Sequence, residues 1–127
     1  MNDQSLAPHK KALQSLKNSI KQPIDEFVRD SVIQRFEFTF ELSWKNLKRY
    51  LETDKPLQDD SVKGVLREAH SRKLISDIEK WFEFHKARNL TSHTYNEDTA
   101  EEVYEIAKKF PKYCEELITN LEVKIAK

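Results

Sequence analysis

The chain has 127 residues, 22 basic and 22 acidic residues, one glycine and four prolines. This length is typical of one domain, so we expect a single unit over residues 1–127, with residues 1–9 frayed. So few turn-forming residues exclude a sandwich or a barrel and favour long helices. A net charge of zero gives no support for a nonspecific nucleic-acid binder or a membrane-surface protein.

The sequence also carries signals of cellular location. Cys114 is the only cysteine, so no internal disulfide can form, which suits a reducing compartment. The sequence contains neither an apolar run long enough to span a bilayer nor the apolar core of a signal peptide. We therefore expect a cytoplasmic protein with no membrane partner.

Apolar residues at helical spacing predict two helices in the first half of the chain. The first covers residues 10–21 and ends at Gln22-Pro23, because proline cannot continue the hydrogen bonding of a helix. The second runs from Asp25 or Asp30 to residue 51, and its main apolar stripe contains Ile33, Phe36, Phe40, Trp44, Leu47 and Leu51. Phe38 and Leu42 form an offset stripe, which we expect a neighbouring helix or another protomer to cover.

The next two helices follow a loop over residues 52–60. Ser61 is the expected N-cap of a short helix that ends near residue 71. Ser76 and Glu79 have the spacing of a capping box, so the following helix is expected to start at Ser76.

The C-terminal part of the sequence predicts a final helix that starts at Asp98, with Glu101 three residues on. Pro111 lies inside this apolar run, so we expect either a kink or two stacked helices. The predicted fold is all-α, an up-and-down bundle of four to five helices.

Residues 88–97, RNLTSHTYNE, concentrate the polar groups that can carry chemistry, and they directly follow the aromatic-rich segment 81–87. The surrounding charge is uneven. Residues 63–93 contain seven Lys or Arg and four acids, whereas residues 97–105 contain five acids and no base. A local anion site is therefore consistent with a chain whose net charge is zero.

Helical geometry gives two faces to this segment. Arg88 and His93 lie about 140° apart on an ideal helix and share a face only if the helix ends or bends between them. Arg88 and Tyr95 share one face, and His85, Asn89 and His93 form an adjoining stripe. The remaining members of the polar patch are Thr91 and Ser92.

These residue types suit phosphodiester chemistry. The planar guanidinium of Arg88 can bind a phosphate through two parallel hydrogen bonds. The imidazole of His93 can give or take a proton near neutral pH. Together they could cleave RNA without a metal, with the ribose 2′-OH as nucleophile. The structural alternative is that Arg88 pairs with Glu83 or Glu97, while His93 bonds a backbone carbonyl at a helix end.

Other site classes find little support. No Cys/His cluster has zinc spacing, so we expect no metal and no cofactor. The chain lacks a Gly-rich phosphate loop and the strand-borne carboxylates of a nucleotidyltransferase, so it is not expected to be one. The aromatic residues expected in the core are Phe36, Phe40, Trp44, Trp81 and Phe82, whereas Phe38 and Phe84 are expected at an interface.

The spacing Arg88-x4-His93-x-Tyr95 resembles the R-x4-H-x-Y motif of the HEPN superfamily. Over residues 10–121 the chain also resembles the nucleotidyltransferase substrate-binding subunit family, most clearly in segments 30–45, 65–69 and 88–95. This resemblance implies a HEPN-like helical bundle that forms a homodimer, with two copies of the motif in a cleft at the dimer interface.

The resemblance further implies a partner, a minimal nucleotidyltransferase encoded nearby, in a toxin–antitoxin pair. The chain would be a metal-independent ribonuclease toxin acting on RNA, in which Arg88 binds the scissile phosphate and His93 is the acid/base. Tyr95 would accept a nucleotide from the antitoxin, with Asn89, Ser92 and His85 as supporting cleft residues. The alternative is a non-catalytic subunit that presents a substrate to the partner enzyme.

Overall fold

The computed structural model describes residues 5–126, which form six α-helices and one short 3-10 turn. In chain order these are α1 (Ala7–Ile20), α2 (Glu26–Leu51), α3 (Val62–Ser71), α4 (Ile78–Asn89), η1 (Leu90–His93), α5 (Glu97–Ala107) and α6 (Phe110–Ala126). No helix among residues 5–126 is long and apolar enough to cross a membrane.

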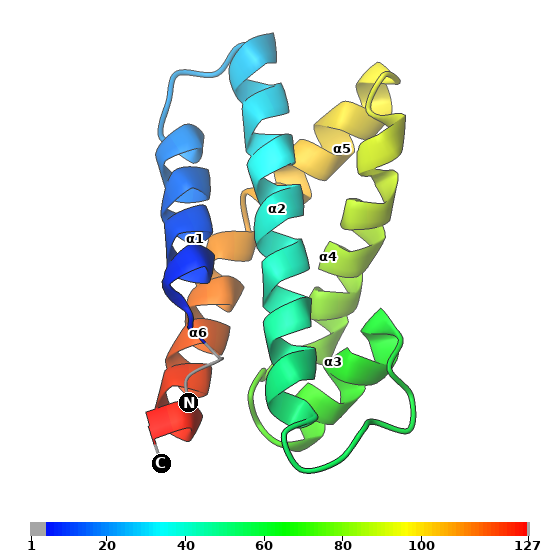
Figure 1. Cartoon of the computed structure of the whole chain (residues 1–127). Helices are drawn as coiled ribbons and strands as arrows, with labels where there is room; N and C mark the ends of the chain where they lie inside the picture. Colours follow the sequence, from blue (N-terminus) through cyan, green and yellow to red (C-terminus); the bar gives the residue numbers. More distant parts are fainter. Residues whose placement is uncertain (1–4, 127) are drawn as a thin grey trace.

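α1, α2 and α4 alternate in direction along the bundle, and α6 continues the direction of α5 (Figure 1). α2 runs back alongside α1, α4 returns beside α2, and α5 and α6 complete the last pass, with α6 against α1. The predicted all-α bundle is confirmed. The described residues contain one helix more than the upper expectation, because Pro111 falls in the first turn of α6 and separates it from α5.

The N-terminal segment is more ordered than predicted. α1 begins at Ala7, and His9 is fully buried, so the expected fraying is wrong for residues 7–9; residues 1–4 lie outside the described part. Ser43 and Asn46 of α2 hydrogen-bond the ring of His9, which fixes the start of α1.

Two of the predicted helix starts are confirmed and two are displaced. Ser61 caps α3 as expected, and Asp25, the earlier of the two starts left open, caps α2; each accepts a hydrogen bond from an amide three residues on. α4, however, is capped by Asp77 rather than Ser76, and α5 by Asn96 rather than by the residue at position 98. In each case a second residue able to cap a helix lies close by: Asp77 directly follows Ser76, and Asn96 lies two positions before Asp98.

The core is an aromatic cluster whose members are fully buried: Phe36, Phe40, Trp81, Phe84 and Phe110. Edge-to-face pairs with ring centroids 5.0–5.3 Å apart join Phe110 to Trp81 and Phe84. The expectation that Phe84 lies at an interface is therefore wrong, because it faces α6 inside the bundle. Phe38 is 55% exposed, so no helix of the described chain covers its stripe fully.

Candidate functional site

The polar motif lies where α4 ends and the chain turns into α5. α4 ends at Asn89, and η1 follows immediately. The hydroxyl of Thr91 donates to the carbonyl of Arg88 at 2.7 Å, and that of Thr94 donates to the carbonyl of Thr91 at 3.2 Å. These side chains satisfy carbonyls that a continuing helix would have used. The motif is therefore built on a helix end, a 3-10 turn and a short connection.

Arg88 points from the last turn of α4 toward α2. Its Nη1 lies 2.8 Å from Oε2 of Glu41, and its guanidinium lies over the Phe40 ring, 5.7 Å from the centroid. Arg88 Nε is buried and has no hydrogen-bond partner among the described residues. The expected partners Glu83 and Glu97 are wrong: the acid that Arg88 meets is Glu41, on another helix.

His85 lies three residues before Arg88 on α4 and contacts the same aromatic ring, Phe40. Its ring stacks on Phe40, with centroids 6.1 Å apart and planes at 15°. Burial lowers the pKa of His85, and the charges of Arg88 and Lys63 lower it further, while Glu41 opposes them. The neutral imidazole is thus favoured, so His85 adds little positive charge to the site.

His93 and Tyr95 lie on the surface. The two rings meet edge-on with centroids 6.1 Å apart, and Tyr95 is 85% exposed. Ser92 is also exposed. Within the described residues no hydrogen bond, ion pair or ring contact joins Arg88 to His93. One chain therefore brings His93 and Tyr95 together but leaves Arg88 engaged with α2.

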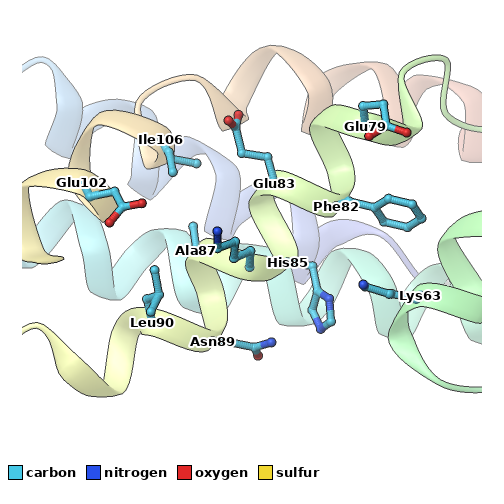
Figure 2. Close-up of a pocket in the computed structure, with 11 residues that line it drawn as sticks. Lys63, Glu79, Phe82, Glu83, His85, Ala87, Asn89, Leu90, Glu102 and Ile106 are labelled. Carbon is cyan, nitrogen blue, oxygen red and sulfur yellow. The ribbon is translucent and has the colours of Figure 1, made fainter.

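A groove of about 520 Å³ follows the exposed side of α4. Figure 2 shows His85 and Asn89 pointing to one side of the helix, toward Lys63 of α3, and Glu83 to the opposite side. Arg88 and His93 do not line this groove. The predicted cleft residues His85 and Asn89 thus lie beside Arg88 on a surface that continues toward α3.

Comparison with known protein families gives a match over almost the whole length of the chain. Residues 4–123 match the family described as nucleotidyltransferase substrate binding protein like. The chain belongs to this family.

Solved structures share its fold. A protein from Thermus thermophilus superposes with a TM-score of 0.81 at 34% identity, covering 89% of this chain and 98% of that one. A Haemophilus influenzae protein superposes with a TM-score of 0.82 at 33% identity, covering 93% and 99%. The latter structure is described as revealing the fold of a substrate binding domain of a nucleotidyltransferase.

A curated relative from Haemophilus influenzae (strain ATCC 51907 / DSM 11121 / KW20 / Rd) is named probable ribonuclease HepT. It is 46% identical over 76 residues, which is 57% of this chain and 52% of the relative. The matched part of the chain thus spans about half the length of that relative.

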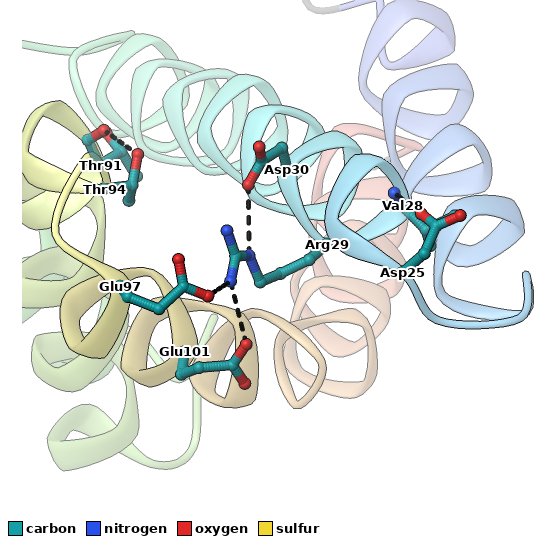
Figure 3. A network of polar contacts seen from close by, with 8 residues as sticks. All are labelled: Asp25, Val28, Arg29, Asp30, Thr91, Thr94, Glu97 and Glu101. Carbon is teal, nitrogen blue, oxygen red and sulfur yellow. Dashed lines mark hydrogen bonds and ion pairs between the residues drawn. The ribbon is translucent and has the colours of Figure 1, made fainter.

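A buried arginine, Arg29, also fixes the position of the motif, although no pattern in the sequence singled it out. Arg29 of α2 is 5% exposed and binds Glu97 and Glu101 of α5, the latter at 3.1 Å, with Asp30 at 3.3 Å (Figure 3). The hydrogen bonds to Glu97 and Glu101 raise the pKa of Arg29 further. Because Glu97 lies two residues after Tyr95, at the first position of α5, this contact fixes where η1 leads into α5.

Glu41 was also missed, although it lies within the family-like segment 30–45. Its contact with Arg88 joins two helices, which the spacing along one helix cannot reveal. The signal available in the sequence was an acid placed directly beside Phe40, a residue of the apolar stripe of a long helix.

Proposed function

We propose that this chain is the HEPN-type component of a two-component toxin–antitoxin system and acts as a metal-independent endoribonuclease. The observation that carries the proposal is the intact Arg88-x4-His93-x-Tyr95 motif at the end of α4, with His93 and Tyr95 exposed to solvent. Membership of the family and the name of the curated relative support it.

In the proposed reaction Arg88 binds the scissile phosphate and offsets its negative charge. His93 takes the proton from the ribose 2′-OH, and the 2′-oxygen forms a bond to phosphorus as the bond from phosphorus to the 5′-oxygen breaks. The departing 5′-oxygen takes a proton from an imidazolium. The products are a 2′,3′-cyclic phosphate and a 5′-OH end.

A homodimer is part of the proposal, because one chain does not bring Arg88 and His93 into contact. Two motifs facing each other across an interface would supply one imidazole as base and another as acid. The outward side of α2 supports such an interface. Phe27 and Phe38 are 82% and 55% exposed there, and eleven residues apart they lie within about 20° on a helix.

The proposed partner is a nucleotidyltransferase, and the proposed cellular location is the cytoplasm. The hydroxyl of Tyr95 is suited to accept a nucleotide, since an 85% exposed side chain can enter another enzyme's active site. A nucleotide on Tyr95 would stand directly beside His93 and restrain cleavage through occlusion and negative charge.

A second candidate is a non-catalytic subunit that presents a substrate to the nucleotidyltransferase. Two observations favour it: Glu41 neutralises Arg88, and the net charge of the chain is zero, whereas a ribonuclease that binds any RNA usually has a positive surface. The description of the Haemophilus influenzae structure agrees with this alternative.

Growth on induced expression tests the two candidates. Wild type, Arg88→Ala, His93→Ala and the control His70→Ala are each expressed with and without the neighbouring nucleotidyltransferase gene. Toxicity that requires Arg88 and His93, survives His70→Ala and disappears with the neighbour supports the toxin. Purified protein should then cleave RNA in the presence of a chelator. If no variant is toxic and purified wild type leaves RNA intact, the ribonuclease proposal is wrong and the binding subunit is favoured.

A further inference from the structure

Glu41 of α2 makes several contacts at the site. Its Oε2 lies 2.8 Å from Arg88 Nη1, and its Oε1 accepts a hydrogen bond from Trp44 Nε1 at 3.3 Å. Lys45 Nζ lies 3.7 Å from the same Oε1. The carboxylate is therefore held in place by its own helix and directed at the guanidinium of α4.

The contact between Glu41 and Arg88 is close but poorly aligned. Glu41 Oε2 and Arg88 Nε are both buried, and neither has a hydrogen-bond partner among the described residues. A guanidinium normally meets an oxyanion through two parallel N–H···O bonds, one of which uses Nε or a second Nη. Here the charge of Arg88 is neutralised while part of its hydrogen-bonding capacity stays unused.

We propose that Glu41 is a built-in counter-ion that occupies the anion position of Arg88 until a phosphate group displaces it. Two oxygens of one phosphate can engage Nη1 and Nη2 together, which the carboxylate does not do, and the displaced Glu41 stays near Lys45. This inference rests on the proposed function only in taking phosphate as the anion. It makes Glu41 a residue that sets affinity and selectivity without taking part in bond breaking.

The same arrangement accounts for a phosphate site on a chain of zero net charge. With Glu41 in place Arg88 presents little free positive charge to isolated anions. An incoming group must outcompete the carboxylate, which favours phosphates that gain further contacts along α4. The ring of Phe40, fully buried and stacked on His85, supports the Arg88 guanidinium from one side, and the Arg88 side chain keeps 24% exposure through which such a group can reach it.

The test is a titration with inorganic phosphate, followed by NMR on the Nε–H signal of Arg88. The proteins are wild type, Glu41→Gln, the control Glu115→Gln and Arg88→Ala, which identifies the signal. Glu115 pairs with Lys17 on the α1–α6 side, so its substitution removes the same charge far from Arg88. Circular dichroism establishes that each variant is folded.

We expect Glu41→Gln to lower the apparent Kd for phosphate about two- to fivefold, the range for loss of a competing, partly exposed ion pair, with Glu115→Gln unchanged. Equal or weaker binding by Glu41→Gln overturns the inference and makes Glu41 a residue that positions Arg88. Tighter binding in both variants also overturns it, since net charge alone would explain the change. RNA cleavage is measured separately. Tighter phosphate binding without cleavage by any form refutes the ribonuclease alone, whereas cleavage that needs Arg88 with unchanged phosphate binding refutes the counter-ion alone.

Discussion

His9 and Ser43 meet in the interior of the bundle, with Nε2 of His9 2.8 Å from Oγ of Ser43. Ser43 already donates its proton to the carbonyl of Thr39 at 2.7 Å, so its oxygen accepts from His9 Nε2–H. The other ring nitrogen, Nδ1, then accepts from the amide of Asn46 at 3.2 Å. This assignment satisfies a neutral imidazole and leaves no acceptor for a second ring proton.

The Sγ atom of Cys114 lies 3.4 Å from the same Nε2, so the two side chains resemble a catalytic thiol–imidazole pair. Burial raises the pKa of the Cys114 thiol to about 12 and lowers the pKa of His9 to about 4, so neither group becomes charged near neutral pH. The cluster therefore joins α1, α2 and α6 as a structural contact and does not act as a nucleophile.

Acid should destabilise the fold through His9. Its folded pKa of about 4 lies below the ordinary 6.5, so the unfolded chain binds more protons between these values. The neutral His9 ring stabilises the fold fully above pH 6.5, and this stabilisation is lost progressively as the pH falls toward 4. The total loss of unfolding free energy is about 3 kcal/mol, at about 1.4 kcal/mol per pKa unit. Urea unfolding of wild type across this range measures it.

The control compares His9→Gln with His70→Gln, an exposed histidine on α3. His9→Gln should flatten the pH dependence of the unfolding free energy, whereas His70→Gln should leave it as in wild type. An equal slope in wild type and His9→Gln would show that other groups, His85 among them, cause the acid sensitivity.

Arg29→Met should cost about 1–3 kcal/mol of unfolding free energy, because it removes a buried cation and leaves Glu97 and Glu101 without it. This range is discounted from that of a fully buried pair, since both acids are exposed. Amide exchange at the start of α5 should also increase. Lys10→Met is the control: Lys10 and Glu122 form an exposed ion pair, so its loss should change stability by less than about 1 kcal/mol. Equal costs for both variants would contradict a structural role for Arg29.

Gly64→Ala should destabilise the protein even though alanine favours helices. An added Cβ would lie 2.3 Å from the backbone oxygen of Asp59, so the loop before α3 would have to move. We expect a loss of about 1–3 kcal/mol, typical of overpacking, against a gain of about 1 kcal/mol from helix propensity alone. Thermal unfolding measures the effect, with His70→Ala, a change to alanine at an exposed position of the same helix, as the control. A Gly64→Ala variant more stable than wild type would show that the loop can move without cost.

What the sequence predicts depends on whether a feature is local. Ser61 caps its helix as expected because a cap needs only the next three residues, whereas the start of the second helix was left open between Asp25 and Asp30. Where two cap-forming residues are neighbours, as with Ser76 and Asp77, local chemistry does not decide between them.

Contacts between helices lie beyond such patterns. The ion pair of Arg88 with Glu41 depends on how α4 packs on α2, and the spacing along α4 suggested acids on its own helix and the next. The prediction that Phe84 lies at an interface was wrong for a similar reason. Apolar residues spread widely around α4, and which of them faces the core is decided by the position of Phe110, on a distant helix.

Tyr95→Phe should separate modification from folding. The hydroxyl lies on an 85% exposed side chain, and the ring contact with His93 does not require it, so stability should change by less than about 0.5 kcal/mol. Incubated with the proposed partner nucleotidyltransferase and ATP, wild type should gain the mass of an adenylate and Tyr95→Phe should not. Tyr113→Phe, at a half-buried tyrosine of α6, is the matched control and should be modified as wild type.

Because removal of the acceptor leaves Arg88 and His93 intact, Tyr95→Phe should also remain toxic in the presence of the proposed partner if modification is what restrains the proposed toxin. Full neutralisation of Tyr95→Phe by the partner would instead show that binding alone blocks the site.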